Sequence, residues 1–179
     1  ALKESGADVF INVASPKFAA QAIRRAGEIG WEPVQFLVSI SNAKSAVLEP
    51  AGLEYSTGII STQYLKEPTN PVYAEDADMI AWREFKANYF PKASDGNWWD
   101  WSCYSTAFTI EHVLTQAGDE LTRENLMHEA QNLKAFEAPM LLPGIMVNTS
   151  EDDFAPIEAM SLMKFDGENW ALFGDIIAV

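Results

Sequence analysis

Hydroxyl side chains follow two apolar runs near the start of the sequence. Ser15 comes directly after the run from Val9 to Ala14, and Ser39 and Ser41 flank Ile40 at the end of the run "VQFLVSI". Hydroxyls and backbone amides can together bind the hydrogen-bonding groups of a small molecule. Serines are also common as helix caps and turn residues, so the residue type alone leaves a structural role and a ligand contact both open.

The elements around these serines form a predicted β-α-β unit. The first apolar run resembles a strand that is covered on both faces. Pro16 suits the first position of a helix, and apolar residues then recur at helical spacing up to Gly30. The second run predicts a second strand. Because the carboxyl ends of parallel strands meet at one edge, where α/β proteins bind ligands, we expect Ala14 and Ser15 to lie beside residues 39–41.

The rest of the sequence predicts three helices between two strand-rich regions. Prolines at 68 and 71 interrupt a strand-like run, which indicates a segment that crosses between two bodies. We expect helices over about 76–89 and 100–117, a third helix capped by Thr122, and a hairpin at Asp166-Gly167. The predicted buried face of the first of these helices comprises Met79, Ile80, Trp82, Phe85 and Tyr89.

Candidates for catalysis are few. His112 and His128 each lie inside a predicted helix with no partner at the spacing of a metal site or catalytic triad. Cys103 has bulky apolar neighbours, which favours a core cysteine over a nucleophile. The acidic run from Glu151 to Asp153 lacks the pattern of a calcium loop. We therefore predict no catalytic residue, metal site or cofactor.

The segment "NWWDWSCY" concentrates aromatic residues at the start of a predicted helix. Trp98, Trp99, Trp101 and Tyr104 could pack in a core or line an aromatic pocket. Adjacent residues cannot both point inward, so we expect Trp98 or Trp99 at a surface or interface.

Composition restricts the class of protein. The chain of 179 residues is 48% hydrophobic, which is typical of a globular protein. The net charge of -14 disfavours nucleic acids and anionic membranes as partners. One cysteine excludes an internal disulfide, and the apolar runs are shorter than a membrane span. The first residues read as the last turn of a helix that ends at Gly6, so we expect an upstream part of the protein.

Several ordered blocks resemble one protein family. The blocks "ADVFINVASPKFAAQAIRRAGEIGW", "VLEPAGLE", "GIISTQYLKEPTNP", "YSTA", "LTRENLMHEAQNLK" and "LPGIMVNTSEDDFAPIEAMSLMKFDGENWALFG" are similar to the C-terminal half of periplasmic solute-binding proteins of branched-chain amino acid ABC importers. The resemblance implies a partial type I periplasmic-binding-protein fold of the α/β class, in which two lobes close on a small ligand.

The same resemblance assigns parts of the chain to the two lobes. Residues 1–60 and 145–179 would form the C-terminal lobe, and residues 72–140 the helical part of the N-terminal lobe. Residues 61–71 and 141–148 would be crossing segments. The implied partners are a small-molecule solute, the membrane subunits of an ABC permease and the missing N-terminal half of the same protein, with no nucleic acid. The implied location is the periplasm, or an extracytoplasmic, membrane-tethered position in a Gram-positive bacterium.

The resemblance adds Tyr104, the tyrosine of the "YSTA" block, to the strand-end residues, so the candidate ligand site comprises Ala14, Ser15, Ser39, Ile40, Ser41 and Tyr104. Relatives that bind leucine-like amino acids carry an acidic residue at the place of Ile40 to hold the ammonium group. An unpaired ammonium in a closed cleft would be costly. We therefore expect an aromatic or other carboxylate rather than a branched-chain amino acid. The alternative function is a ligand-sensing domain of a receptor or regulatory protein with the same fold.

Overall fold

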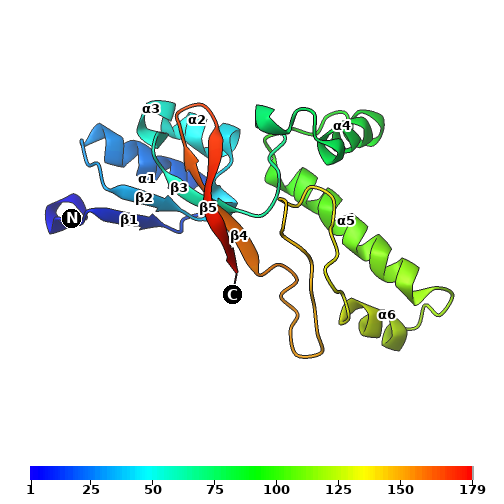
Figure 1. The fold of residues 1–179 in the computed structure, drawn as a ribbon. Coiled ribbons are helices and arrows are strands. Elements are labelled where there is room, and N and C mark those ends of the chain that lie inside the picture. The colour runs from blue at the N-terminus through cyan, green and yellow to red at the C-terminus, as the bar shows by residue number, and fades with distance from the viewer. Residues whose placement is uncertain (179) are drawn as a thin grey trace. The chain divides into compact units, whose positions relative to one another are not determined.

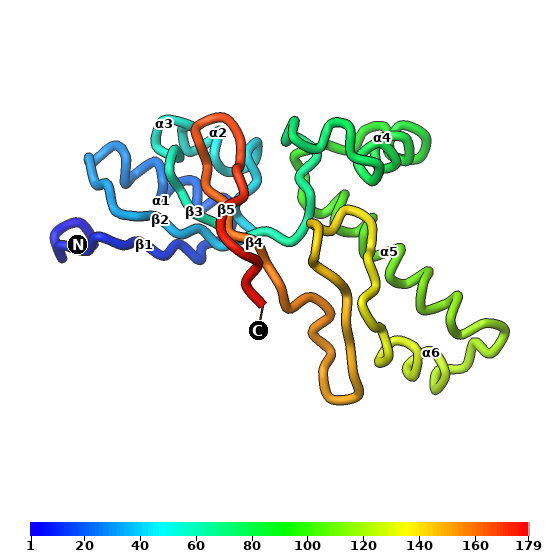
Figure 2. Tube along the Cα trace, viewed as in Figure 1, coloured from blue at the N-terminus to red at the C-terminus, as the bar shows by residue number. Residues whose placement is uncertain are grey.

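The computed structural model describes residues 1–178, which form two compact units. The first unit comprises residues 1–63, 96–98 and 161–175, and the second comprises residues 64–95, 99–160 and 176–178. Figures 1 and 2 follow the chain through both units. The predicted lobe boundaries describe a longer protein and stay a prediction.

The first unit is built on a five-stranded sheet in the order β1-β2-β3-β4-β5 (Figure 1). Strands β1 (Val9–Asn12), β2 (Val34–Leu37) and β3 (Ile60–Gln63) are parallel, with Ile11 opposite Phe36 and Phe36 opposite Ile60. Strand β4 (Ala159–Phe165) runs antiparallel to β3, and β5 (Trp170–Ala178) follows it. At the predicted hairpin, Asp166 Oδ1 accepts hydrogen bonds from the backbone of Glu168 and Asn169 at 2.8 and 2.7 Å.

Helices cover one face of this sheet. They are α1 (Pro16–Glu28), the π-helical turn η3 (Lys44–Leu48), α2 (Glu49–Ala51) and α3 (Leu53–Ser56). Their apolar residues pack with the sheet in one core: Ala19, Ala20, Ile23, Leu37, Val47, Leu48, Ala51, Ile59, Met163, Phe165 and Trp170. The side chains of Ile11, Val34 and Phe36, which alternate with the core positions, are exposed on the other face.

The predicted strands end earlier than their apolar runs. β1 ends at Asn12 because Asn12 Oδ1 accepts a hydrogen bond from the backbone of Ala14 at 3.2 Å, which turns the chain. β2 ends at Leu37, and residues 39–41 form a turn of 3-10 helix, η2 (Ser39–Ser41). A short 3-10 turn, η1 (Lys3–Ser5), precedes β1 and ends at Gly6 in the left-handed conformation.

The second unit contains the three predicted helices, α4 (Ala77–Tyr89), α5 (Trp98–Ala117) and α6 (Arg123–Ala130), after the 3-10 turn η4 (Pro71–Tyr73). Asp76 caps α4 and Thr122 caps α6 through their side-chain oxygens. On α4 only Met79 and Trp82 are buried. The prediction was wrong for Ile80, Phe85 and Tyr89, which are exposed. Phe85 and Tyr89 share a helix face with Trp82, but that face borders an open groove.

Two segments far apart in the sequence lie side by side in this unit (Figure 2). Leu65 and Leu141 form an antiparallel bridge, the backbone of Lys66 donates to Met140 O at 2.8 Å, and Leu142 donates to Tyr64 O at 2.9 Å. These segments contain residues predicted to cross between lobes.

Lys66, Asp76 and Asp78 connect the paired segments to the start of α4. Lys66 is only 7% exposed. Its Nζ lies 2.9 Å from both carboxylate oxygens of Asp76 and 2.8 Å from Asp78 Oδ2, which also accepts a hydrogen bond from the backbone of Met140 at 3.1 Å. We call this three-residue cluster the lysine clasp. It gives one buried cation two carboxylate partners, as burial of a charge requires.

Candidate functional site

The first five candidate residues lie in the first unit, after the ends of β1 and β2. Ser41 Oγ donates a hydrogen bond to Ala14 O at 2.7 Å, so the two predicted strand ends do meet. Ser41 is fully buried, and this bond gives its hydroxyl a structural role. Ser39 is half-buried and Ile40 is 56% exposed. We call the surface formed by residues 14–15 and 39–41 the rim.

Ser15 leaves its hydroxyl outside the helix cap. Its backbone has the extended conformation of a cap residue, and its carbonyl oxygen accepts hydrogen bonds from Phe18 and Ala19 at 2.9 Å each. The side chain makes no capping hydrogen bond and is exposed. An exposed hydroxyl therefore stands beside the amino end of a 13-residue helix, where the helix dipole favours negative charge.

Two buried asparagines support the rim. Asn42 Nδ2 donates to Ser61 Oγ and to Thr62 O at 3.1 Å each, and Asn42 O accepts a hydrogen bond from Trp170 Nε1 at 3.0 Å. These bonds fix the chain directly after Ser41 to the neighbouring strand β3. Asn12 contacts the start of α1, with its Nδ2 lying 3.5 Å from Ala19 O. Sequence reasoning missed both residues; a polar residue next to a predicted strand end was the available signal.

The rim carries no charged side chain of its own. Ile40, the position after β2 where the family resemblance predicts an ammonium contact, is apolar, and its neighbours Ser39 and Ser41 are neutral. Chemically, the rim offers hydroxyls, backbone amides and a helix amino end, and these groups suit a hydrogen-bond acceptor or a carboxylate better than an ammonium.

Tyr104, the sixth candidate, belongs to the second unit and lies in an aromatic cluster between α4 and α5. Its ring centroid is 5.2 Å from that of Trp82, 5.1 Å from that of Phe85 and 5.0 Å from that of Phe108. Burial, followed by the nearby negative charge of Asp78, raises the pKa of the Tyr104 phenol. The phenol therefore stays protonated at neutral pH and can donate a hydrogen bond.

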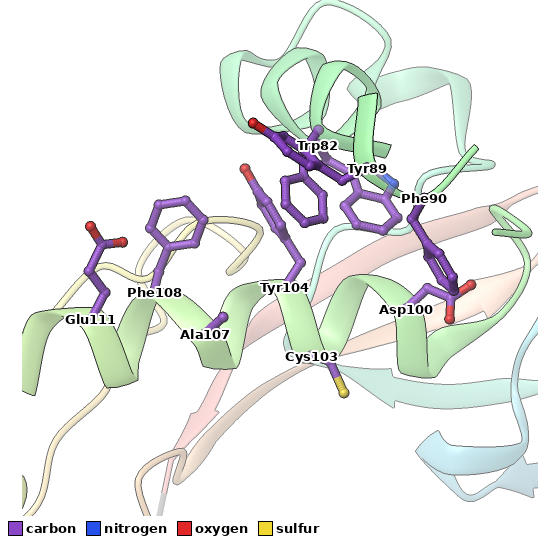
Figure 3. A pocket seen from close by; sticks show the side chains of 10 residues that line it. Trp82, Tyr89, Phe90, Asp100, Cys103, Tyr104, Ala107, Phe108 and Glu111 are labelled. Atoms are coloured by element: carbon purple, nitrogen blue, oxygen red, sulfur yellow. The ribbon is translucent and has the colours of Figure 1, made fainter. Parts of the chain in front are cut away.

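The cluster lines an apolar groove of about 610 Å³ (Figure 3). We call it the aromatic groove; its lining residues are Trp82, Phe85, Tyr89, Phe90, Asp100, Cys103, Tyr104, Ala107, Phe108 and Glu111. Trp82 is 1% exposed, and its indole Nε1 has no hydrogen-bond partner among residues 1–178. The expectation that Cys103 lies in a core was wrong, because α5 turns Trp101, Ser102 and Ser105 inward and leaves the thiol exposed. Trp99 is exposed, as expected for one of the adjacent tryptophans.

The two histidines take part in local packing. His112 stacks on Phe136 with ring centroids 4.2 Å apart, and His128 contacts Asn132 one turn later on the chain. Within the described part of the chain, no group of three or more histidine, cysteine or acidic side chains could hold a metal ion. In the same residues, no helix is long and apolar enough to cross a membrane.

Residues 1–169 match the family described as periplasmic binding protein. The chain belongs to this family. Among curated proteins, no sequence matches this periplasmic binding protein.

Solved structures show the same fold. The chain is similar to a branched-chain amino acid ABC transporter protein from Thermus thermophilus with bound valine, at 12% identity and a TM-score of 0.76, covering 99% of this chain and 48% of that one. It also resembles a substrate-binding periplasmic protein from Ralstonia solanacearum, at 17% identity and a TM-score of 0.75, covering 93% and 45%. A leucine-binding protein from Thermotoga maritima matches at 16% identity and a TM-score of 0.65, covering 96% and 45%.

These matches confirm the predicted family and a partial type I fold of the α/β class. The periplasmic binding protein chain spans about half the length of the solved structures that it matches. The members of its family are proteins that bind small solutes.

Proposed function

We propose that this chain is part of the extracytoplasmic solute-binding component of an ABC importer, which captures a small organic solute between two lobes and delivers it to membrane permease subunits. The rim supports this proposal, because two strand ends joined by the bond between Ser41 and Ala14 present hydroxyls and amides at one edge of a sheet. The other half of the protein's length supplies the remaining solute contacts.

The solute that we propose is an aromatic or other carboxylate. The observation that carries this choice is Ile40, whose side chain stands exposed where an ammonium ligand would need a carboxylate. Ser15 adds a hydroxyl beside the helix amino end, which favours an anionic group. The bound valine of the Thermus thermophilus protein and the leucine-binding name of the Thermotoga maritima protein describe those proteins, whose identity to this chain is 12% and 16%.

A thermal-shift screen of the full-length protein tests the solute class. Aromatic and aliphatic carboxylates should raise the melting temperature more than leucine, isoleucine or valine, since a ligand at a hundredfold its dissociation constant stabilises by about 2.7 kcal/mol. A large shift with leucine and none with organic acids would contradict the proposal.

Two rim variants then test the assignment by calorimetry. Ser15→Ala should weaken binding of the carboxylate at least about tenfold, because it removes one hydrogen bond of about 1.5–3 kcal/mol to a charged group. Ile40→Glu should weaken it further through repulsion. The matched control is Ser45→Ala, which removes an exposed hydroxyl from η3, outside the rim. Equal affinities for Ser15→Ala and Ser45→Ala would exclude Ser15 from the site.

A further inference from the structure

A second groove of about 570 Å³ lies on the helical side of the first unit. One wall is a stripe along α1 with Pro16, Lys17, Gln21 and Arg24, and the other wall contains Ala46 and Pro50. Residues 17, 21 and 24 are spaced by four and three positions, so they share one face of the helix. Because α1 begins at Pro16, directly after Ser15, this groove starts next to the rim.

The charge of this groove differs from that of the chain. The sequence has 26 acidic and 12 basic residues, yet the charged side chains that line the groove are Lys17 and Arg24. Both are exposed. We call this feature the basic groove. A local positive surface on a protein of net charge -14 attracts an acidic partner and orients the protein as it approaches.

The basic groove is held in a fixed shape. The Arg24 guanidinium donates hydrogen bonds to Pro50 O and, at 3.4 Å, to Ala51 O, so it joins α1 to the opposite wall. Ala20, which is buried, lines the groove between Lys17 and Arg24, and the two prolines give it rigid apolar walls. The groove therefore combines apolar area with positive charge and is preorganised for a partner.

The chemistry of the groove favours a protein segment as its occupant. A small anion would meet only exposed cationic side chains and would keep most of its hydration, whereas a protein segment can bury an apolar side chain against the prolines and place a carboxylate near Lys17. The overall negative charge disfavours a nucleic acid.

We propose that the basic groove docks an acidic segment of the importer's membrane permease, a proposal that rests on the function proposed above. A permease must recognise the solute-loaded protein near the place where the solute is released. The groove begins at Pro16, directly after Ser15 of the rim, so a partner seated on Lys17 and Gln21 contacts the helix that follows the rim.

A matched pair of charge reversals tests the proposal in the full-length protein. Lys17→Glu alters the groove, and Arg25→Glu makes the same change of charge on the same helix outside it, at a residue whose partner is the exposed Glu28. Calorimetry first measures the solute affinity of each variant. Stimulation of permease ATPase activity in proteoliposomes is then measured at saturating solute. Lys17→Glu should raise the protein concentration for half-maximal stimulation at least tenfold, and Arg25→Glu should change it less than twofold.

The outcomes separate the two proposals. Stimulation by Lys17→Glu within twofold of the unaltered protein, or an equal loss with Arg25→Glu, would overturn the docking site. Failure of the unaltered protein to bind any carboxylate would instead contradict the proposed solute. Docking is also tested without added solute, by photocrosslinking in the native host with p-benzoylphenylalanine in place of Gln21. An adduct with a transmembrane subunit of an ABC importer supports the proposal, and the absence of such an adduct contradicts it.

Discussion

Replacing Lys66 with methionine should destabilise the second unit strongly. The substitution keeps most of the side-chain volume and removes the cation that lies within 2.9 Å of Asp76 and Asp78. Breaking a buried ion pair costs about 3–5 kcal/mol, but these carboxylates are partly exposed, at 28% and 36%, and water will compensate some of the loss. We therefore expect a loss of about 2–3 kcal/mol of unfolding free energy, which lowers the melting temperature by about 4–12 °C in a protein of about 150–250 residues and by fewer degrees in a longer one.

The assay is thermal and urea unfolding of the full-length protein, with Arg25→Met as the matched control. Arg25 pairs with Glu28 at 3.3 Å on the surface, and an exposed pair contributes less than about 1 kcal/mol. Adding Asp78→Asn to Lys66→Met should recover part of the loss, because it removes one of two facing carboxylates. The reasoning would be refuted if Lys66→Met were no more damaging than Arg25→Met, or if the second substitution brought no recovery.

Three further predictions concern the lysine clasp, Gly27 and the isolated chain. Burial alone would raise the pKa of Asp76, but its hydrogen bond to Lys66 and the charge of Lys66 outweigh burial and lower that pKa below 3.8. Burial alone would lower the pKa of Lys66, but the hydrogen bonds and charges of Asp78 and Asp76 raise that pKa above 10.5. The stability difference between the unaltered protein and Lys66→Met should therefore be constant between about pH 5 and pH 9. It should decline at lower pH as Asp76 is protonated, and at higher pH as Lys66 is deprotonated. A difference independent of pH from about 2 to 12 would contradict this. Gly27→Ala should cost about 1–3 kcal/mol in urea unfolding despite the better helix propensity of alanine, because the new Cβ would overlap the ring of Tyr55, and Tyr55→Ala should abolish that cost. The isolated 179-residue chain should bind a hydrophobic dye, scatter light as an associating species and bind no solute, because the aromatic groove and one sheet face expose apolar side chains; a monodisperse monomer with micromolar solute affinity would show the opposite.

The β-α-β unit could be predicted from the sequence because its signals are local. The apolar run at residue 9, Pro16 at the first helical position and Gly30 after the helix each act through their own backbone preferences, and the structure has the elements where these residues place them. The strand ends were predicted two or three residues too late. Hydrophobicity continues past the last ladder hydrogen bond, and side-chain bonds such as that from Ser41 to Ala14 O decide where the strand stops.

In the second unit, several features depend on contacts that the sequence pattern does not describe. Helix periodicity identifies which residues share a face, as it does for Trp82 and Phe85, but not whether anything covers that face. The lysine clasp was also beyond prediction, since it joins Lys66 to Asp76 and Asp78 through a turn whose geometry no periodicity describes. Pro16 was correctly identified as the first helical position, yet the sequence could not tell that the hydroxyl of the preceding Ser15 would take no part in the helix cap.

The exposed thiol of Cys103 gives this chain a built-in chemical handle. It is the one cysteine of the 179 residues, and it lies at the wall of the aromatic groove. A maleimide fluorophore would therefore attach to this chain at a single known position without any substitution. In Figure 3 its sulfur points to the side of α5 away from the aromatic rings, so a dye at this position would report whether another part of the protein packs against that side of the helix, and protection of the thiol from alkylation would measure the same contact.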